Sequence, residues 1–368
     1  DLLGRDPIQL DLAKLRTELG GKVVLVTGAA GSIGSEIVRQ IIAFRPKLIV
    51  MVDMAESPLY DLELEVTEHP FDRNSRIESV IGDIRNIDRM RNVFKTFKPD
   101  IVYHAAAYKH VPVMENNPSE SILNNVLGTC ILADLAVEFH VPKFVMVSTD
   151  KAVNPTNIMG ATKRIAEIYC QSLNNHNPIT RFITTRFGNV LGSNGSVIPR
   201  FKKQIEMGQP ITVTHPEVTR FFMTIPEACQ LVLEAGAMGK GGEIFIFDMG
   251  ESVNIADLAK KMIRLSGLEL GKDIQIIYSG LRPGEKLYEE LLASEENTIP
   301  THHQKIMIAK VKEYNFETIS NDINDLIALF NAQNNEMIVK KMKEIVPEFI
   351  SQNSVYEKLD EKINESKS

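Results

Sequence analysis

The stretch of sequence that decides the fold is Lys22–Gly34, which reads KVVLVTGAAGSIG. It joins a short β-branched run, a glycine-rich turn and the start of an apolar helical pattern. The first glycine permits a tight turn, the second lets the backbone approach a pyrophosphate, and the third lets helix and strand pack closely. The helix N-terminus offers N–H groups and positive dipole to phosphates. A glycine-rich turn alone is often only structural, but this context predicts a dinucleotide site with candidate contacts at Gly28, Gly31, Ser32, Ile33 and Gly34.

Outward from this stretch, apolar runs alternate with helical patterns along the first half of the chain. Further runs lie at 48–52, 77–81, 101–104 and 144–148, and a long helix is expected from about 119 to 140. The runs are continuously apolar, which is typical of strands buried on both faces. Because crossover connections are right-handed, these elements predict an α/β fold with a doubly wound, Rossmann-like parallel sheet.

After residue 187 the alternation loosens, and Gly and Pro become frequent. We therefore expect a smaller, discontinuous substrate-binding lobe from about 188–222 and 269–312. The dinucleotide-binding domain then comprises 21–187 and about 223–268, preceded by an arm or linker at 1–20. Residues 313–368 are expected to form a helical C-terminal region and a tail, frayed or disordered from about Ser351, where large apolar residues become sparse.

The composition of the chain excludes several classes of protein. Apolar residues make up 43% and charged residues 24% of the chain, which is typical of a folded globular protein. Its 368 residues predict either two closely packed lobes or one large α/β unit. The net charge of −7 argues against nucleic-acid binding. Three distant cysteines fit a reducing compartment, and neither a CxxC pair nor zinc-like spacing around His302-His303 is present, so no metal is expected.

Acidic residues follow two of the predicted strands. Asp53 ends the second strand, 19 residues after Gly34. A carboxylate there accepts hydrogen bonds from adenosine ribose hydroxyls and repels a 2′-phosphate, so NAD is favoured over NADP. The alternative for Asp53 is a solvated loop carboxylate. Asp83 and Ile84 follow the third strand and are candidates for contact with the adenine.

A strip of polar residues marks the end of the fifth predicted strand. Ser148–Lys151 reads STDK, and MGATK follows at Met159–Lys163, which puts its first and last side chains on one helix face. Strand ends at the carboxyl edge of a doubly wound sheet face the ligand crevice. Asp150 and Lys151 form an adjacent acid/base pair if burial and neighbours move the pKa of each toward neutrality. The alternative is a turn with a solvated ion pair.

This layout resembles the extended short-chain dehydrogenase/reductase superfamily, whose catalytic pair is Tyr-x-x-x-Lys. The resemblance covers roughly residues 20–300 and includes the GAAGSIG turn, HAAA at 104–107 and RFGN at 186–189. Within the superfamily, the sequence is most similar to bacterial polysaccharide-biosynthesis nucleotide-sugar 4,6-dehydratases, which act on UDP-N-acetylglucosamine. That similarity rests on LLGR at 2–5, AYKHVP at 107–112, STDKAVNPTN at 148–157 and RPGEK at 282–286.

The resemblance implies a reaction and a cofactor. NAD takes hydride from C4 of the sugar, water is eliminated across C5 and C6, and hydride returns to C6. Asp150 is the implied acid at C6, and Lys151 is the implied base at C5. Lys163 is implied to bind the nicotinamide ribose, with Ala105 and Ala106 as further cofactor contacts.

Met159 stands where the superfamily has its catalytic Tyr. A thioether does not exchange a proton at neutral pH, so another group must take the proton of the 4-hydroxyl. Thr149 and Asp150, directly or through water, are the two candidates. Dehydratases of this family that retain the C5 configuration resemble this sequence in having Met there, so the resemblance implies the C5-retaining subtype.

The implied substrate contacts come from other segments of the chain. Arg220 and Arg282 would clamp the diphosphate, because a guanidinium matches phosphate bidentately. An isolated Arg more often forms a surface salt bridge, so the expectation of diphosphate binding rests on the motifs that surround the two residues. The full set of implied substrate contacts is Lys109, Asn189, Ser196, Val197, Arg220, Arg282 and Glu285.

Two other functions remain open from the sequence. A nucleotide-sugar 4-epimerase needs the same hydride store but no base at C5, so the Asp150-Lys151 pair argues against it. A non-catalytic nucleotide-binding regulator has only Met159 in its favour.

The resemblance also implies a setting for the protein. We expect a homo-oligomer at the cytoplasmic face of the bacterial inner membrane. No apolar run approaches the ~18 residues that span a bilayer, but the chain begins at Asp1 rather than Met. A membrane segment is therefore expected to precede Asp1, since many of the similar dehydratases carry one.

Overall fold

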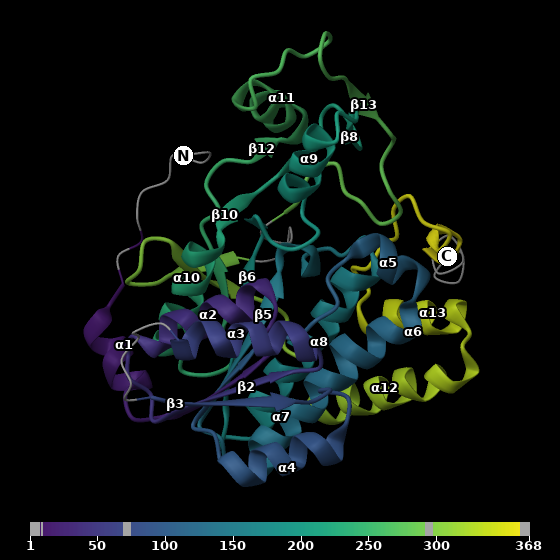
Figure 1. The fold of residues 1–368 in the computed structure, drawn as a ribbon. Helices are drawn as coiled ribbons and strands as arrows, with labels where there is room; N and C mark the ends of the chain where they lie inside the picture. The colour runs from purple at the N-terminus through teal and green to yellow at the C-terminus, as the bar shows by residue number, and fades with distance from the viewer. Residues whose placement is uncertain (1–7, 9, 69–74, 291–296, 361–368) are drawn as a thin grey trace.

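A nine-stranded sheet forms the centre of the protein (Figure 1). The computed structural model describes residues 8, 10–68, 75–290 and 297–360. The strand order is β14-β15-β11-β6-β5-β4-β1-β2-β3. Strands β1 to β6 and β11 run parallel, whereas β15 is antiparallel to both of its neighbours. The strands are β1 (Val23–Thr27), β2 (Leu48–Asp53), β3 (Arg76–Ile81), β4 (Ile101–His104), β5 (Lys143–Thr149), β6 (Arg181–Phe187), β11 (Ile244–Phe247), β14 (Asn297–Pro300) and β15 (Ile306–Lys310).

Two hydrophobic clusters cover the two faces of this sheet. Val24 and Val26 of β1 belong to one cluster and Leu25 to the other, because successive side chains of a strand point to opposite faces. The first cluster includes α1 (Leu12–Leu19), α2 (Ser32–Ile42), α3 (Glu56–Glu68) and α10 (Ile225–Met238). The second includes α4 (Ile87–Phe97), α7 (Gly128–Glu138), α8 (Ile158–His176), α12 (Phe316–Ala328) and α13 (Asn335–Ile345). The predicted doubly wound sheet is confirmed, and its burial on both faces explains the continuously apolar runs.

The predicted long helix is present, but a π-helical turn interrupts its α-helical hydrogen-bond pattern. It consists of α6 (Pro118–Ser121), a π-helical turn η1 (Ile122–Leu127) and α7. By length and composition, Pro118–Glu138 could cross a membrane, but 72% of its most apolar 18-residue stretch is buried inside the protein. It packs against α4 and α8 as part of the second cluster.

The N-terminal and C-terminal segments are both part of the packed structure. Within the expected arm at 1–20, α1 buries Leu15 and Leu19 completely. The expectation of fraying or disorder from Ser351 is wrong for 351–360, because the Asp360 carboxylate accepts hydrogen bonds from the Lys343 ammonium (2.6 Å) and the Ser351 backbone (3.0 Å). Residues 361–368 and the LLGR motif at 2–5 lie outside the described residues.

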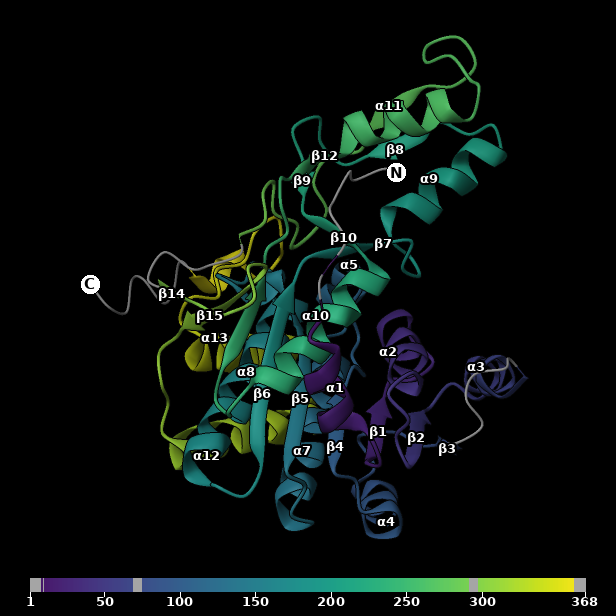
Figure 2. The same ribbon diagram turned by 90° about the vertical axis from the view of Figure 1, so that its left-hand side faces the viewer.

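A third hydrophobic cluster lies beyond the carboxyl ends of the strands, in the group of elements at the top of Figure 1 and Figure 2. Its parallel pair β8–β13 brings together residues 211–213 and 276–278. The elements of this smaller lobe are β7 (Asn189–Leu191), α9 (Val197–Glu206), β8 (Ile211–Val213), β9 (Thr219–Arg220), β10 (Phe222–Thr224), β12 (Val253–Asn254), α11 (Ile255–Leu265) and β13 (Ile276–Tyr278).

The boundaries of the smaller lobe differ from the expected ones at two places. Helix α11, expected in the dinucleotide-binding domain, packs its buried face against α9 in the third cluster. Strands β14 and β15, expected in the substrate lobe, extend the main sheet instead, because β15 pairs along its length with β11. The apolar pattern of β15 alone does not reveal which sheet it joins.

A buried ion network holds α8 against strands β5 and β6. Glu167 of α8 is completely buried and accepts hydrogen bonds from Ser148 Oγ (2.6 Å), Arg186 Nε (2.9 Å) and Arg164 Nη1 (3.2 Å). Burial alone would raise the pKa of Glu167, but the two guanidinium groups and Ser148 outweigh it and hold that pKa below its ordinary value. The charged network therefore fixes α8 relative to the two strand ends beside it.

We predict that Glu167→Gln lowers the free energy of unfolding at pH 7 by about 3–5 kcal/mol, because the buried guanidinium groups of Arg186 and Arg164 lose the carboxylate charge that they share. The difference in unfolding free energy between the parent and the variant should become smaller as the pH falls through the pKa of Glu167. A carboxylate with a depressed pKa stabilises the folded state only while it is charged. Urea titration monitored by circular dichroism measures both effects. The control is Glu138→Gln, which breaks an exposed pair with Arg91 and should cost about 0–1 kcal/mol. Equal small losses in the two variants would contradict the prediction.

Candidate active site

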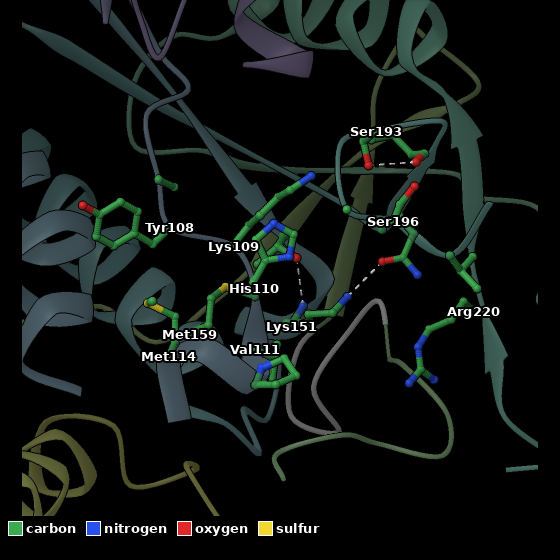
Figure 3. Close-up of a pocket in the computed structure, with 18 of the residues that line it drawn as sticks. Tyr108, Lys109, His110, Val111, Met114, Lys151, Met159, Ser193, Ser196 and Arg220 are labelled. Atoms are coloured by element: carbon green, nitrogen blue, oxygen red, sulfur yellow. Dashed lines mark hydrogen bonds between the residues drawn. The ribbon is translucent and has the colours of Figure 1, made fainter. Parts of the chain in front are cut away.

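One cavity of about 880 Å³ opens at the carboxyl end of the sheet, beneath the smaller lobe. Figure 3 draws part of its lining, with Lys151 between Met159 and Arg220 in that view. Of the candidate residues from the sequence, the cavity is lined by Gly28, Gly31, Ser32, Ile33, Gly34, Ala105, Lys109, Thr149, Lys151, Met159, Lys163, Asn189, Ser196, Val197, Arg220, Arg282 and Glu285. The fold thus brings the glycine-rich turn, the strip at the end of β5 and the substrate candidates to one space.

The glycine-rich turn has the geometry that a pyrophosphate site needs. Gly28 has φ +64°, and a Cβ there would lie 2.6 Å from the Ala106 Cα, so only glycine fits. Helix α2 begins at Ser32, and its N-cap residue Gly31 makes no side-chain capping bond. The helix N-terminus therefore presents uncapped N–H groups and its positive dipole to the cavity, which fits the diphosphate of a dinucleotide.

Asp53 does not lie in the cavity lining, and its partly buried carboxylate is held by two backbone N–H groups. Its Oδ2 accepts a hydrogen bond from the Ala30 backbone (3.0 Å) and its Oδ1 one from the Ala55 backbone (2.9 Å). The carboxylate therefore ties the end of β2 to the glycine-rich turn. Its contact with a ribose stays a prediction.

Three other cofactor candidates also lie outside the cavity lining. Ala106 abuts Gly28 through its backbone, and Ile84 is buried against Gly128. Asp83 is paired with Arg85 (2.7 Å), whose hydrogen bonds hold the pKa of the Asp83 carboxyl below its ordinary value. In this arrangement Asp83 is engaged by a neighbour on its own loop.

The strip at the end of β5 forms a compact acid/base cluster in the short helix η2 (Asp150–Ala152). Thr149 Oγ1 donates to Asp150 Oδ1 at 3.0 Å, and Lys151 Nζ donates to the same oxygen at 3.1 Å. Lys151 Nζ also donates to Asn189 Oδ1 at 3.1 Å, one of the dashed bonds in Figure 3. The side chain of Asp150 is completely buried, so the alternative of a solvated ion pair does not hold.

The pKa of Lys151 moves in the direction opposite to the one that a role as a base requires. Burial alone would lower it toward neutrality, but the negative charges of Asp150 and Glu289 outweigh burial and raise the pKa of Lys151 above its ordinary value. Sequence analysis missed Glu289, whose Oε1 lies 3.6 Å from Lys151 Nζ. The resting lysine is therefore an ammonium at neutral pH.

Met159 and Lys163 lie on the first turns of α8. Asn157 caps this helix by accepting a hydrogen bond from the Gly160 backbone at 2.7 Å. A Cβ at Gly160 would lie 2.9 Å from the Lys151 carbonyl carbon, so glycine lets the helix start directly against η2. Both Met159 and Lys163 are buried, and burial lowers the pKa of Lys163 to about 8.

The two arginines predicted to bind diphosphate face a common carboxylate. Arg220 Nη2 lies 3.0 Å from Glu285 Oε1, and Arg282 Nε lies 3.4 Å from Glu285 Oε2. Arg220 Nε is also 3.8 Å from Glu289 Oε1. An anion entering here would therefore exchange places with carboxylates that already hold the guanidinium groups.

Lys109 lies in the same lining, and burial lowers its pKa. Other lining residues were not predicted, among them Tyr108, His110, Arg200 and Glu289. Tyr108 and His110 lie within the AYKHVP motif, but no residue pattern distinguishes Arg200 or Glu289 from ordinary surface charges.

Comparison with known proteins identifies the family. The sequence pattern of the "Polysaccharide biosynthesis protein" family matches residues 24–311, so the chain belongs to this family. The fold is that of an extended short-chain dehydrogenase/reductase, and the relatives include a nucleotide-sugar dehydratase and an epimerase.

Particular relatives give this class more detail. The capsular polysaccharide biosynthesis protein CapD of Staphylococcus aureus is 55% identical over 90% of this chain and 55% of its own length. Two relatives are each 35% identical over 75% of this chain and 79% of their own: a UDP-glucose 4-epimerase of Rickettsia canadensis and a UDP-N-acetylglucosamine 4,6-dehydratase (inverting) of Campylobacter jejuni. The solved structure of Pen from Bacillus thuringiensis, 34% identical, matches 83% of this chain and 98% of its own with a TM-score of 0.71. The chain spans about half the length of the first of these relatives.

We predict that Lys163→Met makes the protein more stable at pH 7, by about 3 kcal/mol, because the buried ammonium is costly in the folded state. The folded protein releases this proton near pH 8, whereas the unfolded chain keeps it to about pH 10.4. The parent therefore gains stability as the pH rises through that window, and the advantage of the variant should shrink. Thermal unfolding between pH 7 and 10 measures this, with the exposed Lys202→Met as the control. A variant no more stable than the parent at pH 7 would refute the prediction.

Proposed function

We propose that this chain is a UDP-N-acetylglucosamine 4,6-dehydratase that retains the configuration at C5. The observation that carries the proposal is the buried Asp150–Lys151 pair. Lys151 lines the same cavity as the uncapped helix N-terminus of α2, whereas Asp150 lies outside the lining and is hydrogen-bonded to Lys151 and Thr149, which line it. An elimination across C5 and C6 needs an acid and a base side by side, whereas a simple hydride exchange at C4 does not. The S. aureus and C. jejuni relatives support the setting in polysaccharide biosynthesis and nucleotide-sugar chemistry.

The cofactor in this proposal is NAD, held by the glycine-rich turn and by Lys163. When bound, NAD⁺ supplies a reversible hydride acceptor for C4 of the sugar. The α2 N-terminus would hold its diphosphate, and Lys163 would bond its nicotinamide ribose. The smaller lobe would bind the nucleotide, with the diphosphate against Arg220 and Arg282 and the uridine near Asn189, Ser196 and Val197.

The cluster at β5 would handle the protons. The 4-hydroxyl proton would pass to Asp150 through Thr149, since Thr149 Oγ1 already donates to Asp150 Oδ1. Asp150 would then give that proton to O6 as water leaves, and Lys151 Nζ would take the proton from C5 and return it there. Return by the same amine places the proton on the face it left, which is retention.

Met159 supports the retaining subtype within this proposal. Its side chain is buried in the cavity wall at the position of the superfamily's Tyr, and it has no proton to exchange. The proton route therefore bypasses α8 and uses Thr149 and Asp150 on β5 and η2.

The experiment that tests the proposal is NMR analysis of the product made from UDP-N-acetylglucosamine in deuterated water with added NAD⁺. We expect a 4-keto-6-deoxy sugar with the original configuration at C5 and partial deuterium there, because the Lys151 amine carries deuterium from the solvent and returns one of its several hydrogens. A C4 epimer would favour the epimerase, which the Rickettsia relative keeps as the second candidate. An inverted C5 would keep the dehydratase and remove the retaining subtype. Binding of NAD⁺ without conversion of the sugar nucleotide would favour the non-catalytic regulator.

We predict that Lys151→Met and Asp150→Asn each lower turnover by about 10²–10⁴-fold, because each removes one partner of the acid/base pair. Affinity for UDP should stay near that of the parent in both, since the proposed diphosphate contacts lie on β9 and at 282–285. Calorimetry with UDP and product formation measured by NMR give the two quantities. Near-parental turnover in Lys151→Met would remove the main reason for preferring a dehydratase.

We also predict that NAD⁺ binds more tightly than NADP⁺, because the Asp53 carboxylate lies at the end of β2, where a 2′-phosphate would be repelled. Asp53→Asn should narrow that preference while keeping an oxygen that can accept from the Ala30 backbone. Fluorescence titration with the two dinucleotides measures it. Tighter binding of NADP⁺ by the parent would overturn the assignment.

A further inference from the structure

Glu289 is a buried carboxylate in the cavity wall for which the proposed mechanism has no role so far. Its side chain is 4% exposed, and its Oε1 lies 3.6 Å from Lys151 Nζ and 3.8 Å from Arg220 Nε. Among the residues that the structure describes, its other oxygen, Oε2, has no hydrogen-bond partner. Keeping a carboxylate buried with one oxygen unpaired costs free energy, so the position calls for an explanation.

The proposed dehydration, on which this inference rests, fixes how many protons the cluster can carry. The 4-hydroxyl gives up one proton, and O6 needs one proton to leave as water. C5 loses one proton and regains one. If Asp150 carries the first of these protons from O4 to O6, Lys151 must both take and return the second. The balance closes only if Lys151 starts as a neutral amine.

The resting cluster holds one proton more than this balance allows. Three charged groups face the Lys151 ammonium: Asp150 from its own turn, Glu289 from the segment after the RPGEK motif, and Arg220 from β9. The two carboxylates outweigh burial and Arg220, so Lys151 is protonated at neutral pH. One proton must leave Lys151 before the C5 proton can be taken.

Two carboxylates lie near enough to receive that proton, and only one is available. Asp150 Oδ1 already accepts from Thr149 and Lys151, and Asp150 is needed for the 4-hydroxyl proton. A carboxyl group holds one proton, so Asp150 does not serve both purposes. Asp150 Oδ2 and Glu289 Oε2 both lack a hydrogen-bond partner among the residues that the structure describes, so the steps of the reaction decide between them: Asp150 is occupied by the 4-hydroxyl proton, and Glu289 has no other step to serve.

We propose that Glu289 is a positioning residue that acts through Lys151, taking its surplus ammonium proton when substrate fills the cavity and holding it during turnover. The step converts an ammonium–carboxylate pair into an amine and a carboxylic acid. One N–H bond breaks and one O–H bond forms, and no proton goes to solvent. At the end of the cycle the proton returns to Lys151.

Two features of the cavity favour this transfer once substrate is bound. Substrate displaces water, and a dry site favours a neutral pair over an ion pair. Arg220 is a proposed diphosphate contact and also lies beside Glu289. When its guanidinium turns to the phosphates, Glu289 loses a positive neighbour that stabilises its charged form. Diphosphate binding and activation of Lys151 are thereby linked through one carboxylate.

The first test compares pH profiles of turnover in the parent, Glu289→Gln, Glu289→Asp and Glu290→Gln. Without an internal acceptor, the proton of Lys151 must go to solvent, so Glu289→Gln should lose about 10²-fold or more at pH 7. The turnover of Glu289→Gln should then rise about tenfold per pH unit up to pH 9, because the fraction of Lys151 present as the neutral amine rises at that rate. Glu289→Asp keeps an acid and should restore most of the activity at pH 7.

Glu290→Gln is the matched control, one residue along the chain. Glu290 is half-exposed and pairs with Lys286 at 2.8 Å, away from Lys151. This variant should follow the parent at every pH. A merely structural role for Glu289 would lower activity by the same factor across the pH range.

A second readout does not depend on turnover. NMR of ¹³Cε-labelled lysine, with the Lys151 signal assigned by its loss in Lys151→Arg, follows the titration of Lys151 directly. Its midpoint should lie about one pH unit lower in Glu289→Gln than in the parent, because one negative neighbour is gone. Equal midpoints would overturn the inference, whether or not UDP-N-acetylglucosamine is the substrate.

The outcomes separate this inference from the proposed function. If the parent does not dehydrate UDP-N-acetylglucosamine, the proposed function is wrong, and the titration of Lys151 still tests whether Glu289 acts on its charge. A parent that does, with a Glu289→Gln variant of unchanged pH profile, overturns only the inference. If Glu289→Gln does not fold, the parent suffices: a Lys151 midpoint below about pH 8 would mean that there is no surplus proton to hold.

Discussion

Glu167 carries the contacts on which the reactive end of the sheet depends. It joins Ser148 of β5, Arg186 of β6 and Arg164 of its own helix through one completely buried carboxylate. Arg164 in turn bonds Glu348 at 3.1 Å, beyond the end of α13. Because Lys163 and Met159 lie on the same helix, their positions relative to η2 follow from this network. A buried charge is tolerated only when it is fully paired, so the arrangement has little freedom to shift.

The charges in the cavity wall are also paired with one another, but in a different way from those around Glu167. In the cavity wall, Glu285 is closely paired with Arg220 and also faces Arg282, whereas Glu289 lies near Lys151 and Arg220 at longer distances. Such pairs can exchange partners when an anionic ligand arrives, whereas the network around Glu167 cannot without burying an unpaired charge. The contrast separates the charges that hold the fold from those that we propose take part in binding and proton transfer.

The site also depends on a segment beyond the part of the chain that matches the family pattern. Gln352 accepts a hydrogen bond at 2.8 Å from Gly284, within the RPGEK motif. Ser354 donates at 2.8 Å to Glu115, whose other oxygen accepts from the Ile158 backbone at the start of α8. The C-terminal region therefore links the loop of Arg282 to the helix of Met159. These hydrogen bonds, together with the buried side chains of Tyr356 and Leu359, hold a stretch that has few large apolar residues.

The sheet, the glycine-rich turn and the strip at the end of β5 could be predicted from the sequence, because each leaves a pattern of residue types within a short stretch of the chain. Continuous apolar runs require burial on both faces, and Gly28 requires the close approach of Ala106. The charge state of Lys151 depended on Glu289, and the partners of Arg220 on Glu285, residues far away in sequence that only the tertiary structure brings together. Electrostatic interactions act through space and depend on burial, so no pattern of spacing along the chain encodes them. The sequence thus pointed to Asp150 and Lys151 as candidates, and the fold decided which charges surround Lys151.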